Sequence, residues 1–167
     1  GYGVRKDEAF PALIEKKLQA RGKPIKAINA GISGSVTAEA DRRLKWQLKN
    51  KPDVLVLALG GNDALKGTPV ATIKKNLGVA IDLAQQNKIK VLLVGIKVFS
   101  NFGANYAQEL ERMYADLARE KKVKLLPFLL EGVALNKALN QADGKHPNAK
   151  GHEVVAETVL KELEPLL

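Results

Sequence analysis

The stretch Val54-Leu55-Val56-Leu57-Ala58-Leu59, followed at once by Gly60-Gly61-Asn62-Asp63, decides the fold class of this chain of 167 residues. A continuous apolar run that ends in glycines predicts a strand buried on both faces, as in a parallel sheet. Val91-Leu92-Leu93-Val94-Gly95-Ile96 repeats the pattern further along. The polar residues after the first run then lie at the carboxyl end of a strand, where open parallel sheets bind their ligands.

Around these two runs, strand-like and helix-like spacing of apolar residues alternates. Shorter strands are expected at residues 25–29 and 123–126, the second ending before Pro127. Helices are expected at residues 10–18, 37–50 (with Thr37 as N-cap), 72–86, 104–120 and 150–164. This alternation predicts an α/β fold with a parallel sheet, right-handed crossovers and helices on both faces. Because no linker or repeat interrupts the pattern, residues 1–167 are expected to form a single domain.

Composition excludes several classes of protein. There is no cysteine, so disulfides and thiolate metal sites are ruled out. The net charge is +9, but the lysines are scattered in short pairs on predicted helices, and aromatic residues make up only 5%. No nucleic-acid motif accompanies this charge, and no apolar run approaches the ~20 residues of a membrane span. We therefore expect no nucleic-acid partner and no stable membrane insertion.

Near the C-terminus, Asp143-Gly144-Lys145-His146 lies on a predicted loop before the last helix. A carboxylate and an imidazole at this spacing suit acyl transfer, with His as general base and Asp as its orienting group. Two glycine-containing stretches, residues 30–35 and 60–63, each follow a predicted strand. All three loops are therefore expected to converge at the carboxyl rim of the sheet.

Taken singly, each of these residues has an ordinary structural explanation. Gly34 fits a turn, Asn62 and Asp63 fit a helix cap, and His146 fits a surface position before a proline turn. Their occurrence together favours a functional site. His152, at the start of the last helix, is expected to have a structural role.

In order and spacing, these stretches resemble the SGNH (GDSL-type) hydrolases, whose sequence blocks supply Ser, Gly, Asn and His. The loop around Gly34 resembles the Gly block, residues 60–63 the G-x-N-D block and residues 143–146 the D-x-x-H block. Further stretches resemble the bacterial arylesterase, acyl-CoA thioesterase and lysophospholipase branch: Arg43-Leu44-Lys45-Trp46, Ser100-Asn101-Phe102-Gly103 and residues 127–133. The resemblance covers essentially the whole chain and implies a three-layer α/β/α sandwich with a flavodoxin-like parallel sheet.

The resemblance implies a role for each matching residue. The backbone N–H of Gly34 and the side-chain N–H of Asn62 would hold the oxyanion. His146 would be the general base, and Asp143 would orient it. The implied activity is that of a serine esterase or thioesterase that needs no metal or cofactor and acts on a small-molecule ester or thioester.

The resemblance also suggests surroundings for this site. Leu65, Phe99 and Phe102 are expected to form walls of an acyl pocket, although core packing explains the two Phe residues almost as well. A periplasmic or secreted location is expected, and a cytoplasmic one stays open. The oligomeric state is not predicted.

Two features depart from the family pattern. Ser35 stands where many relatives have Asp, a change that a backbone oxyanion donor should tolerate. The Ser block, a strand leading into Gly-Asp-Ser-Leu, is missing, and Ser33, Ser35 and Ser100 are not expected to replace it. We therefore expect an upstream strand that ends near a Ser and lies between the strands at 25–29 and 54–59, or else a strand borrowed from a partner. The alternatives are a non-catalytic acyl- or carbohydrate-binding relative and an inactive fragment.

Overall fold

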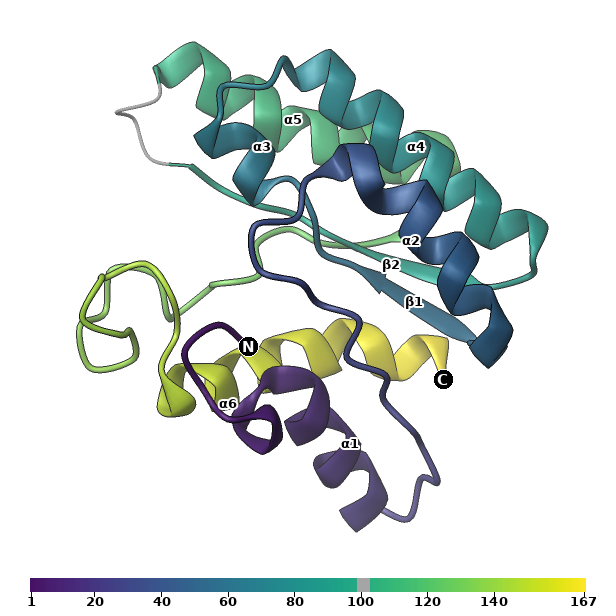
Figure 1. Ribbon diagram of the computed structural model, residues 1–167, viewed down its shortest axis with the longest axis vertical. Helices are drawn as coiled ribbons and strands as arrows, with labels where there is room; N and C mark the ends of the chain where they lie inside the picture. Colours follow the sequence, from purple (N-terminus) through teal and green to yellow (C-terminus); the bar gives the residue numbers. More distant parts are fainter. Residues whose placement is uncertain (99–102) are drawn as a thin grey trace. The chain divides into compact units, whose positions relative to one another are not determined.

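In the computed structural model, which describes residues 1–98 and 103–167, three strands form a parallel sheet in the order β1-β2-β3 (Figure 1). The strands are β1 Val54–Leu57, β2 Lys90–Val94 and β3 Lys124–Leu126. In the register, Val54 pairs with Lys90 and Leu92 pairs with Lys124. The apolar runs therefore form parallel strands, and the predicted α/β fold is confirmed.

The described residues divide into two units. The first, which we call the sheet unit, comprises Gly34–Leu129 and Pro165–Leu167. The second, which we call the helical unit, comprises Gly1–Ser33 and Leu130–Glu164. The expectation of a single domain over residues 1–167 stays a prediction, as does the second helical layer of the expected sandwich.

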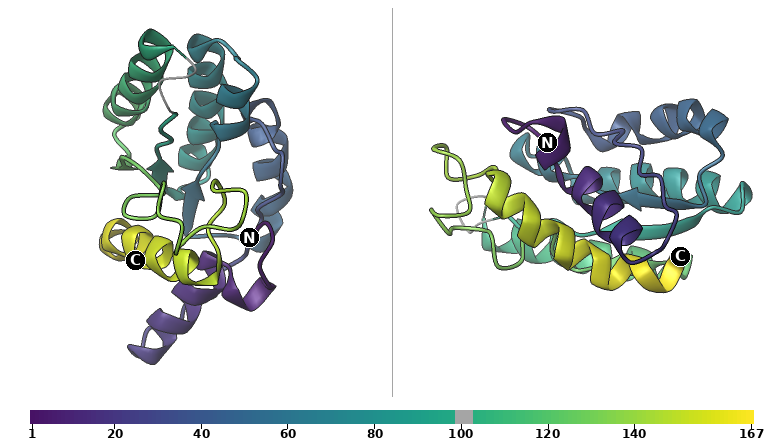
Figure 2. Two further views of the ribbon diagram at one scale, coloured as in Figure 1. Left: turned by 90° about the vertical axis from the view of Figure 1, so that its left-hand side faces the viewer. Right: turned by 90° about the horizontal axis from the view of Figure 1, so that it is seen from below.

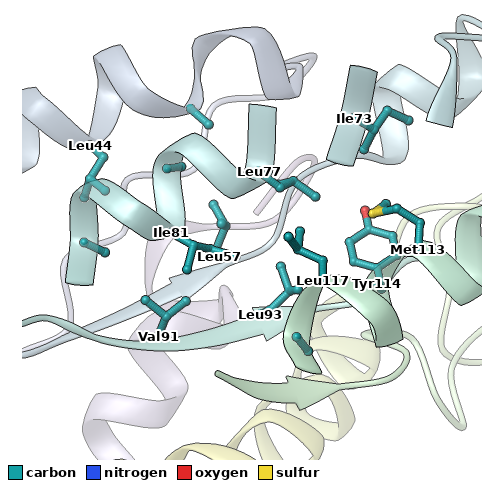
Figure 3. Close-up of a cluster of buried hydrophobic side chains, with 14 of the residues drawn as sticks. Leu44, Leu57, Ile73, Leu77, Ile81, Val91, Leu93, Met113, Tyr114 and Leu117 are labelled. Atoms are coloured by element: carbon teal, nitrogen blue, oxygen red, sulfur yellow. The ribbon is translucent and has the colours of Figure 1, made fainter. Parts of the chain in front are cut away.

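Helices of the sheet unit cover one face of the sheet (Figure 1). They are α2 Ala40–Gln47, α4 Val70–Gln86 and α5 Ala104–Lys121; short 3-10 turns, η2 Thr37–Glu39 and η3 Leu48–Asn50, flank α2. The helices α4 and α5 pack on each other and on β2, and α2 packs on α4. Figure 3 shows the buried side chains between these helices and the sheet, which include Leu57, Ile73, Leu77, Ile81, Leu93 and Leu117. This apolar core holds the carboxyl ends of β1 and β2 in place.

Two helices of the helical unit lie side by side, as Figures 1 and 2 show. They are α1 Phe10–Ala20 and α6 Ala149–Leu163, with the short turns η1 Lys6–Glu8 before α1 and η5 Glu164–Leu166 after α6. Leu18 of α1 and Val159 of α6 are fully buried. At the surface, Lys17 Nζ lies 3.1 Å from a Glu153 carboxylate oxygen and 2.9 Å from one of Glu157.

The predicted strand at residues 25–29 is wrong. Residues 23–32 form neither a helix nor a strand. A strand needs a hydrogen-bonded neighbour, and the strands in the described residues pair only as β1-β2-β3. The strand β1 lies at the end of the described sheet and has a neighbour on one side only. Val54, Leu55 and Val56 are therefore only half-buried, although burial on both faces was predicted. The upstream strand stays a prediction.

The other predicted elements are confirmed to within a few residues, with two differences in detail. Thr37 does not cap a helix with its side chain, because its hydroxyl bonds to Asp63 instead. Residues 61–65, expected as loop, form the short helix α3 Gly61–Leu65. Both differences concern residues beside the candidate site.

Candidate active site

The two expected oxyanion donors, Gly34 and Asn62, both lie in the sheet unit, Gly34 on a loop and Asn62 in the short helix α3. The Asn62 Nδ2 group donates a hydrogen bond to the backbone carbonyl of Ser35, with an N–O distance of 2.9 Å. Gly34 has φ +81°, a left-handed conformation that favours glycine. A side-chain amide carries two N–H donors. One N–H of Asn62 therefore binds the Gly34 loop, and the second is the one suited to an oxyanion.

A buried tyrosine fixes the end of the strand that leads to Asn62. Tyr114, on α5, donates its hydroxyl to the backbone carbonyl of Leu59 at 2.7 Å. Burial, with the Asp63 carboxylate nearby, raises the pKa of Tyr114, so the phenol keeps its proton. A Cβ at Gly60 would lie 2.0 Å from the Tyr114 hydroxyl, so only glycine fits there. This contact sets where α3 begins.

Asp63 links α3 to the segment that follows Gly34. Its side chain is buried, and one of its oxygens accepts the Thr37 hydroxyl at 2.6 Å. The backbone N–H of Thr37 reaches both carboxylate oxygens, at 2.9 and 3.1 Å. We did not predict this link from the sequence. The available signal was the position of Asp63 inside the G-x-N-D match, next to Asn62.

The Asp143 and His146 side chains pair as expected, within the helical unit. His146 Nδ1 lies 2.7 Å from Asp143 Oδ2. Asp143 Oδ1 accepts the backbone N–H groups of Lys145 and His146, at 2.9 and 3.0 Å. These hydrogen bonds hold the pKa of the Asp143 carboxyl well below its usual range. An ionised Asp143 accepts the Nδ1–H, which leaves His146 Nε2 as the nitrogen that takes a proton.

Backbone and ring contacts hold the loop that carries His146. The backbone N–H of Gln141 donates to the His146 carbonyl at 2.8 Å. The Gln141 side-chain amide donates to the carbonyls of Tyr2 and Pro147, at 2.7 and 2.9 Å. The Tyr2 and His146 rings lie 4.6 Å apart between centroids, tilted by 46°. Sequence reasoning did not identify Tyr2 as a neighbour of His146.

Asn148 anchors the same loop to α6. Its side-chain oxygen caps the helix by accepting the Gly151 N–H at 3.0 Å. Its amide group donates to the carbonyls of Ala138 and Asn140, at 3.0 and 3.1 Å. One asparagine therefore fixes both the start of α6 and the base of the loop that holds His146.

The second histidine, His152, belongs to the packing between α1 and α6. It is buried, and its Nδ1 accepts the backbone N–H of Phe10 at 3.3 Å. Burial lowers the pKa of His152 to about 4, so the ring is neutral at pH 7. These features fit the structural role expected for it.

Of the residues expected to line the acyl pocket, only Leu65 is described. It ends α3 and is 56% exposed, so it is free to contact a ligand but is not part of the core. Phe99 and Phe102 lie outside the described residues. Their role, and that of Leu65, stays a prediction.

The described residues show neither a metal cluster nor a membrane span. Within residues 1–98 and 103–167, no three His, Asp or Glu side chains are grouped so that they could hold a metal ion. In that same part of the chain, each helix is too short or too polar to cross a bilayer. The candidate groups are thus two pairs: Gly34 with Asn62 in the sheet unit, and Asp143 with His146 in the helical unit. Their convergence on one rim stays a prediction.

An α/β fold with a parallel sheet, an Asn–Gly pair and an Asp–His pair is the arrangement that the resemblance to SGNH hydrolases implies. The sequence profile of the GDSL-like Lipase/Acylhydrolase family matches residues 1–154, and the chain belongs to that family. The resemblance to SGNH hydrolases is therefore confirmed.

Similar proteins include enzymes of several names. Esterase TesA of Pseudomonas aeruginosa is 37% identical over 166 residues, covering 99% of this chain and 83% of the relative. The Escherichia coli protein named thioesterase 1/protease 1/lysophospholipase L1 is 33% identical over 168 residues, covering 100% of this chain and 79% of the relative. The crystal structure of TesA has a TM-score of 0.95 at 36% identity and covers 99% of this chain and 93% of its own. The family is thus one of hydrolases that act on carboxylic esters and thioesters.

Proposed function

We propose that the natural protein hydrolyses small-molecule carboxylic esters or thioesters through an acyl-enzyme. His146 is the general base, Asp143 its orienting carboxylate, and Gly34 N–H and Asn62 N–H the oxyanion donors. The observation that carries the proposal is the 2.7 Å contact between His146 Nδ1 and Asp143 Oδ2, in a chain that belongs to an acylhydrolase family. This contact fixes the tautomer that leaves Nε2 free to act as base.

The proposed reaction has two halves. In the first, His146 Nε2 takes the proton of a serine hydroxyl while its oxygen bonds to the substrate carbonyl carbon. Gly34 and Asn62 stabilise the resulting oxyanion, and the imidazolium returns the proton to the departing alcohol or thiol. In the second half, His146 deprotonates a water molecule, which attacks the acyl-serine, and the imidazolium returns the proton to the serine oxygen as the carboxylic acid leaves.

Ser35 does not fit the role of the nucleophile. Ser35 is buried, and its Oγ accepts a hydrogen bond from Arg43 at 2.6 Å. Ser33 lies in the same loop, and Ser100 is outside the described residues. The proposal therefore assigns the nucleophile to a serine beyond these 167 residues.

The proposal also covers the residues that contact the substrate and the cellular location of the protein. Leu65, Phe99 and Phe102 are proposed to contact the acyl chain, with Leu65 exposed at the end of α3. A periplasmic or secreted location is proposed from the family resemblance, and cell fractionation tests it.

Hydrolysis and covalent labelling of the purified natural protein test the proposal together. We expect turnover of p-nitrophenyl acetate or butyrate, and labelling by a fluorophosphonate probe, which reacts with activated serines. Peptide mapping should place the label on a serine other than Ser33, Ser35 or Ser100. A folded protein that neither turns over these esters nor takes the label would overturn the proposal and favour a non-catalytic binding protein.

A further inference from the structure

We propose that Asp63 is a positioning residue whose buried carboxylate clamps the Gly34 loop to Asn62 and so sets the spacing of the two oxyanion donors. This inference rests on the proposed function, since it concerns the oxyanion hole of that reaction. It adds a residue that neither contacts the reacting atoms nor belongs to the His–Asp pair.

The clamp joins the two loops at adjacent points. Asp63 follows Asn62 in α3, and its partner Thr37 lies three residues after Gly34. The carboxylate takes two donors from Thr37, its N–H and its hydroxyl, at 2.6 to 3.1 Å. Beside it, the Asn62 amide bonds to the Ser35 carbonyl at 2.9 Å. Two cross-links therefore fix residues 35–37 against residues 62–63.

Only a carboxylate satisfies this geometry. The Asn76 side-chain N–H donates to the Thr37 hydroxyl oxygen at 3.1 Å, so the hydroxyl directs its own proton to Asp63. Asp63 thus faces two donors from Thr37, the hydroxyl at Oδ1 and the backbone N–H at both oxygens. An asparagine at this position would accept one donor and present its own N–H₂ to the other. At a residue only 2% exposed, water cannot relieve that mismatch.

The clamp is needed because α3 and Gly34 have few contacts of their own to hold them in place. The helix α3 has 5 residues, too few to hold its orientation by its own hydrogen bonds. Gly34 itself is exposed and has no side chain, so it has little packing of its own to fix it. Small errors in donor placement are costly in catalysis, since a displacement of about 1 Å lowers rates by about 100-fold. The clamp therefore acts on the rate of the chemical step more than on substrate binding.

The test compares Asp63→Asn with Asp53→Asn, which makes the same change at an exposed position of the sheet unit. In the natural protein, we expect Asp63→Asn to lower kcat about 10- to 100-fold with KM within about twofold of wild type. Asp53→Asn should match wild type. Thr37→Val should also lower kcat. Thr37→Ser, which keeps the hydroxyl, should retain most of the wild-type kcat.

A second readout does not depend on activity. In ¹⁵N NMR spectra, the Gly34 backbone amide and the Asn62 side-chain amide should shift or broaden in Asp63→Asn and Thr37→Val, but not in Asp53→Asn. If the wild type fails to hydrolyse esters, the proposed function fails, and the clamp is then judged by these resonances alone. If Asp63→Asn does not fold, Thr37→Val decides.

Two results would overturn the clamp. One is unchanged Gly34 and Asn62 resonances in the folded variants. The other is a wild-type kcat per folded molecule in Asp63→Asn, which would show that the carboxylate contributes to folding only.

Discussion

The side-chain amide of Asn62 has two proposed tasks, which are to bind the Gly34 loop and to donate to the oxyanion. One N–H of its amide already bonds to the Ser35 carbonyl at 2.9 Å. This bond aims the amide and costs the reaction nothing, since the second N–H is the one proposed to meet the oxyanion. A preorganised donor of this kind is worth more in the transition state than in the bound substrate.

Replacing Asn62 with Ala should therefore lower kcat by about 10²–10³, with little change in KM. Steady-state hydrolysis of a p-nitrophenyl ester measures both constants. Asn50→Ala, at an exposed asparagine of the sheet unit, is the matched control and should leave both unchanged. A rise in KM alone would make Asn62 a ground-state binding residue instead.

At this scale, a contact within one short loop was more predictable from the sequence than contacts between distant segments. The Asp143–His146 pair was predictable because both partners lie within one short loop. The Asp63–Thr37 link was not, because its partners are 26 positions apart and buried aspartates have no distinctive local pattern. Tyr2 was missed for a similar reason: only the fold brings its ring to His146.

Among the elements, α6 has a start that depends on one glycine. A Cβ at Gly151 would lie 2.1 Å from the Leu139 carbonyl oxygen and 2.9 Å from the Pro147 side chain. Both neighbours belong to the region that Asn148 ties to the His146 loop. This close approach lets α6 begin directly under that loop.

Gly151→Ala should therefore destabilise the protein by about 1–3 kcal/mol, because either the loop or the helix must move. Gly78→Ala is the control in the middle of α4, where a Cβ would meet side-chain atoms no nearer than 3.7 Å. There, the better helix propensity of alanine should leave stability unchanged or raise it. Denaturant unfolding measures both variants. Equal stabilities for the two would contradict the tight contact at Gly151.

The α1–α6 pair should also be sensitive to acid through His152. Its pKa falls from 6.5 to about 4 on folding because the ring is buried. Between these values the unfolded chain binds a proton that the folded chain excludes, so the free energy of unfolding decreases as the pH falls through this window. His152→Gln removes the titrating group and should flatten the dependence of Tm on pH between about 6.5 and 4. Parallel Tm profiles for the two proteins would show that His152 is not the cause.

The secondary structure was predictable wherever local pattern and packing agree. The helix α4 and the strand β2 follow their apolar spacing closely, because both pack into the core seen in Figure 3. The strand at 25–29 failed since a strand is defined by its neighbour and not by its own residues. The helix α3 was missed because Gly61 and Asn62 favour turns, and its 5 residues hold no apolar period.

At the scale of the whole molecule, the chain belongs to a family of hydrolases that act on carboxylic esters and thioesters. The net charge is +9, yet several lysines are paired with acids, as Lys74 is with Glu120 at 2.6 Å and Lys121 with Asp82 at 2.6 Å. The proposed oxyanion donors belong to the sheet unit and the His–Asp pair to the helical unit. The proposed reaction thus takes its base from one unit and its oxyanion donors from the other.

The most direct test of the proposed reaction is the turnover of a short p-nitrophenyl ester by the natural protein and by its His146→Ala variant. We expect His146→Ala to lower kcat by at least about a thousandfold, because the nucleophile loses its base. Lys145→Ala, in the same loop, is the control and should keep near-wild-type turnover, with circular dichroism showing that both variants are folded. A folded His146→Ala variant that retains more than about a tenth of the wild-type kcat would contradict the assignment of His146 as the base.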